Sequence, residues 1–195
     1  ENVLSEVGSG RLSRRTPALR EQVAWFLSDY PYTAQAYDVF NLMLDATAGA
    51  TTRSKIRRIM QWAASHEGGE HEAIVAYYSA YHLHRRGSYE LALSLARDQQ
   101  YSFPALADRL EMLQALCHVQ MRRFEEAGEV LEGFVERRSD SPLLPQALFL
   151  SGWMMLQQGR TADAFERMED VAARFPDTDA AGKAERILEN VASRL

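Results

Sequence analysis

The stretch FLSGWMMLQQGRTADAFERMEDVAARFP, residues 149–176, decides the fold because it recurs upstream in the same register. The earlier copies are YYSAYHLHRRGSYELALSLARDQQYSFP at residues 77–104 and MLQALCHVQMRRFEEAGEVLEGFVERRS at residues 112–139. Internal repeats of this length indicate supersecondary units that bury their apolar faces by stacking on one another. The sequence therefore predicts an array of similar units.

Within each copy, a small residue on a first helix is followed twelve positions later by an alanine on a second helix. Antiparallel helices that cross closely need small side chains at the crossing, because the distance between their axes follows side-chain size. The turn between the two helices is predicted at Gly87, Arg122 and Gly159, and the copies close at Pro104, Ser139 and Pro176. The crossing pairs are Ala80/Ala92, Ala115/Ala127 and Gly152/Ala164.

These units resemble tetratricopeptide repeats, which combine a small residue in the first helix, an aromatic residue that opens the second, an alanine at the crossing and a terminal proline. Tyr89 and Phe124 supply the aromatic residue, whereas Thr161 replaces it in the third unit and Ser139 replaces the proline in the second. The resemblance implies an all-α chain that forms a right-handed α-solenoid of antiparallel helix hairpins, with three such repeats over residues 70–177.

The flanking segments are expected to continue the helical array. Helical spacing of apolar residues predicts three helices in residues 16–66, as degenerate repeats or an N-terminal cap. They run from Thr16 to Pro31, from Thr33 to a left-handed cap at Gly49, and from Thr51 or Thr52 to His66. Residues 1–15 have no period and are predicted to be a flexible tail or linker, and residues 178–195 a C-terminal capping helix.

The apolar residues of the flanking helices predict which faces are buried. In the first helix these are Leu19, Val23, Phe26, Leu27 and Tyr30; in the second, Ala36, Tyr37, Phe40, Met43 and Leu44; in the third, Ile56, Ile59, Met60 and Ala63; and in the last, Ala184, Ile187, Leu188 and Val191. No sustained apolar–polar alternation predicts a strand.

The cluster HEGGEH at residues 66–71 raises the question of a metal site. A zinc helix of the H-E-x-x-H kind places its histidines four residues apart, whereas His66 and His71 are five apart with two glycines between them. We interpret the segment as a solvated turn before the first clear repeat and expect no bound metal or other cofactor. The lone Cys117 is predicted to be a buried small residue, because no basic activator lies near it on its helix face.

Composition and charge exclude several other functions. The net charge is −5, which provides no basic field for nucleic acid. The basic run RSKIRR, Arg53 to Arg58, is interpreted as a solvated helix surface rather than a phosphate clamp. No apolar run is long enough to insert in a membrane. The motifs of nucleophilic hydrolases and nucleotide-binding enzymes are absent, so we expect the chain not to be an enzyme.

The resemblance implies that the first helices of successive units line a concave groove that binds peptides. Aromatic side chains and arginine carry much of the binding energy at protein interfaces, so such residues on these helices are candidate contacts. Trp153, Phe149 and Leu116 have the alternative of packing in the core, because an apolar helical stripe is usually buried. The predicted groove residues are Tyr77, Tyr81, His84, Arg85, Arg109, Met112, Gln120, Phe149, Trp153 and Gln157, with Leu116 and Gln146 beside them.

The sequence therefore predicts a non-catalytic scaffold or adaptor that binds a protein or peptide partner, with self-association as a further possibility. The alternative is a helical accessory or regulatory domain of an enzyme or metal-dependent protein whose chemistry lies outside this chain. The start at Glu1, without methionine, leads us to expect a processed protein or a piece of a longer one.

Two features bear on the source of the chain and on its compartment. Arginine supplies all but Lys55 and Lys183 of the 22 basic residues, a bias typical of GC-rich bacterial genomes. Residues 140–188 also resemble the repeats of bacterial envelope proteins, which favours the cell envelope or periplasm over the cytoplasm without fixing the compartment.

Overall fold

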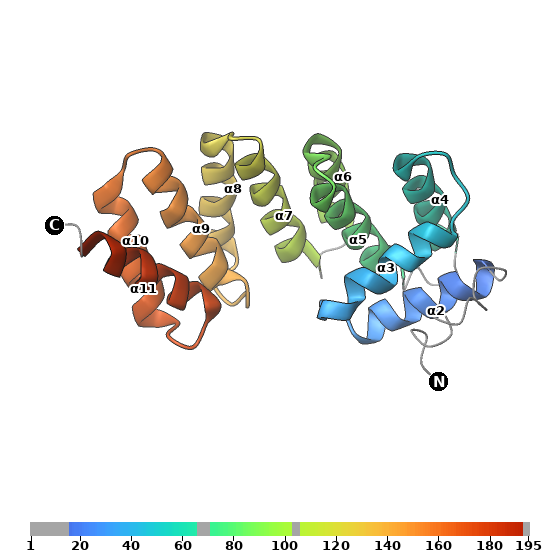
Figure 1. The fold of residues 1–195 in the computed structure, drawn as a ribbon, viewed down its shortest axis with the longest axis horizontal. Coiled ribbons are helices and arrows are strands. Elements are labelled where there is room, and N and C mark those ends of the chain that lie inside the picture. Colours follow the sequence, from blue (N-terminus) through green and yellow to red (C-terminus); the bar gives the residue numbers. More distant parts are fainter. Residues whose placement is uncertain (1–15, 66–70, 103–105, 193–195) are drawn as a thin grey trace. The chain divides into compact units, whose positions relative to one another are not determined.

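The computed structural model describes residues 16–65, 71–102 and 106–192, and every regular element in those ranges is a helix (Figure 1). The predicted all-α class is confirmed. Contacts divide the chain into two compact units, residues 1–106 and 107–195, a division that falls inside the predicted three-repeat segment. Unit 1 holds α2 (Thr16–Asp29), α3 (Ala34–Ala46), α4 (Thr52–Ala64), α5 (Glu72–Arg85) and α6 (Tyr89–Ser102); unit 2 holds α7 (Ala107–Gln120), α8 (Phe124–Arg137), α9 (Leu144–Gln157), α10 (Thr161–Arg174) and α11 (Asp179–Ala192).

Three helix pairs form hairpins, α5–α6, α7–α8 and α9–α10, and each first helix ends in the same turn. Gly87, Arg122 and Gly159 all have the left-handed conformation, with φ of 76°, 59° and 78°. In each turn, the following residue donates its N–H to the carbonyl five positions back; the pairs are Ser88 to Leu83, Arg123 to His118 and Arg160 to Met155, at 2.9, 2.9 and 2.8 Å. This Schellman arrangement confirms the predicted turns and the α-solenoid pattern of packed hairpins.

The helix crossings depend on small residues, as the sequence predicts. All three pairs, Ala80/Ala92, Ala115/Ala127 and Gly152/Ala164, are buried. A Cβ atom added to Gly152 would lie 3.4 Å from the Ala164 carbonyl oxygen and 3.3 Å from the Arg167 Cγ. A larger side chain there would force α9 and α10 apart.

In unit 1, the predicted start of α4 is correct, whereas the predicted end of α3 is not. Thr51 caps α4 through a reciprocal pair of hydrogen bonds with Ser54, both 3.2 Å long. The predicted left-handed cap at Gly49 is wrong, because α3 already ends at Ala46. Thr47 ends that helix in an extended conformation, and its hydroxyl donates to the Met43 carbonyl at 2.7 Å.

Gly49 serves a different purpose, which is close packing against the start of α4. A Cβ atom on it would come within 2.6 Å of the Ser54 Oγ. The glycine therefore lets the connection between α3 and α4 pass tightly over the capping residues.

The predicted buried faces of α2, α3 and α4 largely form the core of unit 1. Leu19, Val23 and Leu27 of α2 are buried, as are the predicted residues of α3 apart from the half-buried Tyr37. The prediction that Tyr30 is buried is wrong, because its side chain lies beyond the end of α2 and is 56% exposed. Met60, also predicted to face inward, is half-buried.

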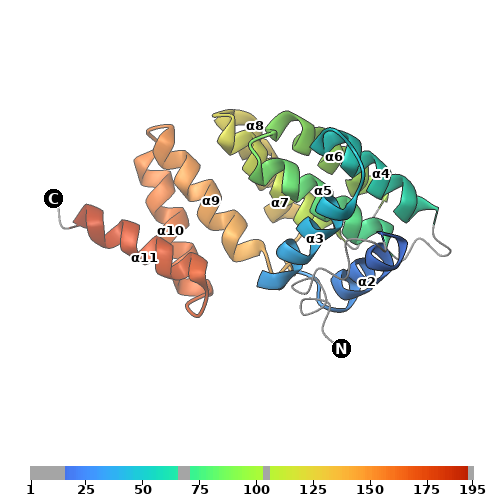
Figure 2. The same cartoon turned by 45° about the vertical axis from the view of Figure 1, so that its right-hand side comes forward.

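In unit 2, α11 packs against α9 and α10 and extends their core (Figure 2). Ala184 is fully buried there, and Ile187 and Leu188 pack against the same cluster. The predicted position Val191 lies outside the described side chains. α11 therefore covers an apolar face of the α9–α10 hairpin, and its role as a capping helix stays a prediction.

A buried carboxylate ties α7 to the end of α8, and the sequence did not indicate it. Glu111 is 3% exposed and accepts hydrogen bonds from the guanidinium groups of Arg137 at 2.9 Å and Arg138 at 3.2 Å. Gly133 makes this possible, because a Cβ atom there would lie 2.7 Å from an Arg137 guanidinium nitrogen.

Candidate partner-binding surfaces

Tyr77, Tyr81 and Arg85 occupy successive turns of α5 and form one surface with Tyr37 of α3, here called the tyrosine surface. Residues four apart lie above one another on a helix, and the Tyr77 and Tyr81 rings stack at 6.0 Å with 15° between their planes. The edge of one ring of the Tyr37/Tyr81 pair meets the face of the other at 5.2 Å. The guanidinium carbon of Arg85 lies 5.7 Å from the centroid of the Tyr37 ring.

The loop between α2 and α3 holds this surface from the N-terminal side. Tyr32 has a left-handed φ of 69°, and its backbone N–H donates to the Tyr78 hydroxyl at 3.2 Å. Its ring meets Tyr77 edge to face at 5.6 Å. Of the predicted groove residues in unit 1, Arg85 is exposed and Tyr77 and Tyr81 are half-buried, so the structure brings these three together.

His84 does not contribute to the tyrosine surface in the predicted way. Both of its ring nitrogens are buried without a hydrogen-bond partner among the described residues, and the ring meets Tyr89 edge to face at 5.5 Å. The ring nitrogens of this predicted groove residue are therefore not exposed to a partner in the groove. Burial, followed by the neighbouring Arg85 charge, lowers the pKa of His84 below its ordinary value.

His82 is the polar centre of the packing behind the tyrosine surface. Its Nδ1 lies 3.0 Å from the Asn41 Oδ1 and 3.2 Å from the Tyr37 hydroxyl. Burial is the main cause that lowers the pKa of His82; Arg86 lowers it further and Asp45 opposes the shift. A polar cavity of ≈ 620 Å³ adjoins it, with Lys55 and Arg86 on its lining.

In unit 2, the predicted groove residues divide between surface and core. Gln120, Gln146 and Gln157 are exposed and Arg109 is half-buried. Phe149, Trp153 and Leu116 are partly buried against the two core clusters of unit 2. The prediction of Met112 as a groove residue is wrong, because its side chain is 4% exposed and packs in the core formed by residues of α7, α8 and α9.

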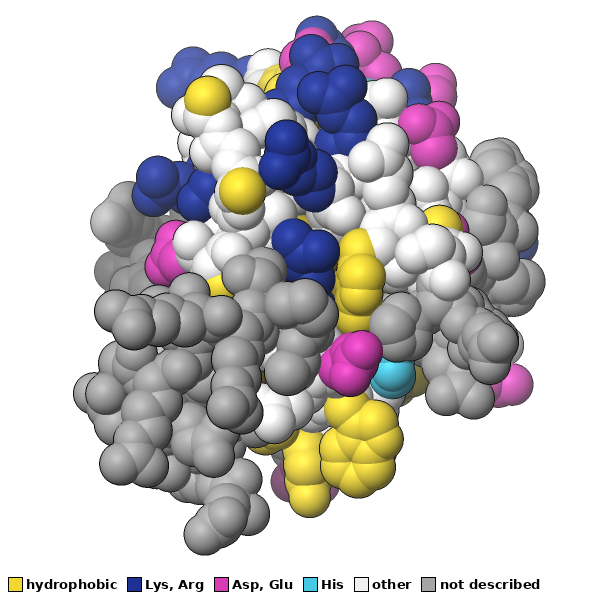
Figure 3. Space-filling view, turned by 90° about the vertical axis from the view of Figure 1, so that its right-hand side faces the viewer, with side chains coloured by type: hydrophobic (Ala, Val, Ile, Leu, Met, Phe, Trp, Pro, Cys, Tyr) yellow, Lys and Arg dark blue, Asp and Glu magenta, His cyan; other side chains and the backbone are white. Residues whose placement is uncertain are grey.

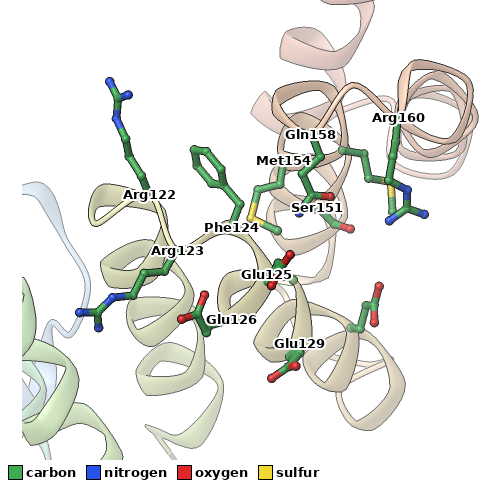
Figure 4. Close-up of a pocket in the computed structure, with 13 residues that line it drawn as sticks. Arg122, Arg123, Phe124, Glu125, Glu126, Glu129, Ser151, Met154, Gln158 and Arg160 are labelled. Carbon is green, nitrogen blue, oxygen red and sulfur yellow. The ribbon is translucent and has the colours of Figure 1, made fainter.

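The tyrosine surface belongs to unit 1 and the other predicted groove residues belong to unit 2, so each set is described by itself. Unit 2 also has a large cleft of ≈ 950 Å³ between α8 and α9, lined from both helices and from their connecting turns (Figure 4). It was not predicted, because its acidic lining has the pattern of an ordinary solvated helix face.

The basic run of α4 lies at the surface of unit 1, as expected. Arg53, Arg57 and Arg58 are exposed, and dark blue side chains gather over this part of the unit in Figure 3. None of the three makes an ion pair among the described residues.

The structure describes only part of the HEGGEH segment, and it describes Cys117. His66 and the two glycines after it lie outside the described residues, whereas the His71 Nδ1 lies 3.0 Å from the Ser28 hydroxyl. In the described part of the chain, no group of three or more His, Cys, Asp and Glu is arranged to hold a metal ion. Cys117 is buried, as predicted.

The hairpins, their shared turn and their small crossing residues define a helical-repeat protein. A family model with the description "Tetratricopeptide repeat" matches residues 146–178, which span α9 and α10. This match supports assignment to the tetratricopeptide repeat family, and the same turn recurs in α5–α6 and α7–α8. No curated protein matches the sequence significantly. None of the described helices is long and apolar enough to cross a membrane.

Proposed function

We propose that the chain is a non-catalytic scaffold that holds a segment of a partner protein against the first helices of its hairpins. A tetratricopeptide repeat suggests a role in protein interaction. The observation that carries the proposal is the tyrosine surface, where two stacked tyrosines and an arginine stand on one face of α5.

The packing of this surface favours binding because it is arranged in advance. Aromatic stacks restrict side chains that a partner would otherwise have to immobilise, and this reduces the entropic cost of association. Tyrosine combines a large apolar ring with a hydroxyl that forms hydrogen bonds, and arginine provides directed donors. In unit 2, Trp153, Phe149 and Gln157 on α9 are the corresponding candidates.

Site-specific photocrosslinking in cells tests the proposal. A photoreactive phenylalanine at position 81 is expected to crosslink a partner protein, whereas the same residue in place of the exposed Arg53 is not. Arg85→Ala, which removes an exposed cation without opening the core, is expected to reduce that crosslink about fivefold or more, given the cost of losing an interfacial arginine.

The control for Arg85→Ala is Arg57→Ala on α4, which removes the same charge elsewhere in unit 1. A crosslinked product equal to twice the mass of the chain would show self-association instead of a separate partner. Equal crosslinking from positions 81 and 53, or an unchanged yield in Arg85→Ala, would contradict the proposed binding surface.

A further inference from the structure

The cleft between α8 and α9 is lined in part by small and flexible residues. Gly128 faces α9, and a Cβ atom added to it would lie 3.7 Å from the Met154 Cε. Met154 and Met155 are buried in the cleft wall. Methionine side chains are flexible and polarizable, so they adapt to an alkyl chain placed against them.

Three glutamates of α8, here called the acidic row, line the side of the cleft across from Met154 and Met155. Glu125, Glu129 and Glu132 are four and three residues apart on α8, a spacing that places them on one face of the helix. All three are exposed, and none makes an ion pair or hydrogen bond among the described residues. Like charges on adjacent helical turns repel one another, and a cation in the cleft would relieve this repulsion.

Ser151 provides an independent observation that points to a ligand. It lines the cleft and is only 4% exposed, yet its hydroxyl has no hydrogen-bond partner among the described residues. Serine in a helix commonly donates to the carbonyl four residues back, which this hydroxyl does not do. The side chain of Ser151 thus offers an unused donor and acceptor in the lining of the cleft, beside Met154 on α9 (Figure 4).

The basic residues at the rim do not make an anion site. In Figure 4, the guanidinium groups of Arg122, Arg123 and Arg160 point away from one another, so one anion could not bridge them. Arg160 is also paired with Asp163 at 2.7 Å. A metal ion fits poorly, since the described residues hold no suitable cluster of three ligands. The remaining complement is an organic cation with an alkyl stem.

We propose that this cleft binds a segment of a partner protein through a lysine or arginine side chain. The alkyl stem lies on Met154 and Met155, the charged head lies against the acidic row, and the Ser151 hydroxyl forms a hydrogen bond with the bound segment. The proposal rests on the proposed scaffold role, but it places the contact in unit 2, on residues other than those of the tyrosine surface, and names the chemistry of the partner.

Peptide titration of the full chain tests the proposal, followed by NMR through the backbone amide signals of Glu129, Ser151 and Gln158. The probes are the peptides Ac-Gly-Ser-Ala-X-Leu-Ala-Ser-Gly-NH2 with X as lysine, acetyl-lysine, arginine, citrulline or glutamate. The lysine and arginine peptides are expected to shift these signals saturably. The neutral acetyl-lysine and citrulline peptides are expected to bind roughly fivefold more weakly, the scale of one solvent-accessible ion pair.

Matched variants separate the cleft from the general negative charge of the chain. Glu129→Gln and Glu136→Gln remove the same charge from α8, but only Glu129 lines the cleft. Glu129→Gln is expected to weaken the lysine peptide roughly fivefold and Glu136→Gln to leave it unchanged. Ser151→Ala is expected to weaken it about threefold while preserving the fold, because the hydroxyl has no internal partner to lose.

Three results would overturn the proposal: no saturable shift at the cleft, equal binding of lysine and acetyl-lysine peptides, or equal losses in the two glutamate variants. The experiments distinguish a failure of the proposed cleft site from a failure of the proposed tyrosine surface. An intact crosslink at position 81 with no peptide binding at the cleft rejects this site alone, whereas loss of that crosslink with peptide binding retained rejects the tyrosine surface.

Discussion

At the residue scale, buried polar groups are the part of the structure that the sequence predicted least well. Glu111 looks like a surface residue because carboxylates are rarely buried unless they are paired. Its partners, Arg137 and Arg138, are 26 and 27 residues away and reach it only once α7 and α8 have packed together. Helical periodicity identifies faces, but it does not identify a pairing between side chains on different helices.

The same limit explains the corrections at single positions. Met112 was predicted on an inner surface from helical geometry, but neighbouring helices on several sides bury it. The nitrogens of His84 are enclosed by the chain around them. In contrast, Ala80, Ala92, Ala115 and Ala127 were predicted correctly, since a small residue at a fixed spacing has one clear structural reason.

The lowered pKa of His82 predicts that the protein loses stability in mild acid. Its pKa is lowered in the folded state, so below the ordinary histidine pKa of about 6.5 the unfolded chain binds a proton that the folded chain does not. The free energy of unfolding is therefore expected to be highest at neutral pH and to fall as the pH decreases through 6.5 towards the lowered pKa. His84 acts in the same direction.

Urea denaturation at a series of pH values from neutral to mildly acidic measures this effect. His82→Gln and His84→Gln are each expected to reduce the slope of unfolding free energy against pH in that range, and the double variant should reduce it further. If the double variant keeps the wild-type slope, burial of these two rings does not control the pH response.

At the element scale, the unit of the structure is a hairpin closed by a left-handed residue. The sequence identified this position in all three units although only two of them have glycine there. An arginine in the left-handed region carries strain of about 1–2 kcal/mol, which the two hydrogen bonds of the Schellman turn help to offset. Arg122, with φ 59°, is the strained copy.

Arg122→Gly is expected to stabilise the chain by up to about 1 kcal/mol, because relief of strain exceeds the extra entropy of glycine in the unfolded state. The control is Gln158→Gly at the residue before the third turn, where φ is −87°. It is expected to destabilise by about 0.5–1 kcal/mol, since glycine brings only its entropic cost there. Thermal unfolding of both variants gives the comparison, and a lower stability of Arg122→Gly would contradict the equivalence of the three turns.

The connections between hairpins were harder to predict than the turns inside them. Gly49 was expected to cap α3, but Thr47 ends the helix three residues after Leu44, to whose carbonyl it donates its backbone N–H at 3.2 Å. Threonine offers both an extended backbone and a side-chain hydrogen bond, and the choice between it and a later glycine depends on how α4 packs. Tyr32 is a similar case, because its left-handed φ is held by contacts with α5.

At the scale of the whole molecule, the chain consists of two compact helical units, and we propose a binding surface of different chemistry on each. Unit 1 has an aromatic surface with an exposed arginine, whereas unit 2 has an acidic cleft lined by methionine. Repeat geometry in the sequence predicted the class of fold and part of the first surface. The cleft requires α8 and α9 to be placed together, which no pattern along one helix could indicate.

Both surfaces depend on the same physical claim, namely that small residues at three equivalent crossings let the helices of each hairpin pack closely. The most direct measurement is the urea denaturation of Ala80→Leu, Ala115→Leu and Gly152→Leu beside Gly182→Leu, where no atom lies within 4 Å of an added Cβ. We predict that each crossing variant loses about 1–3 kcal/mol or more from overpacking, whereas Gly182→Leu is unchanged or gains up to about 1 kcal/mol of helix propensity. If the crossing variants are as stable as Gly182→Leu, the close-packed hairpin array is contradicted.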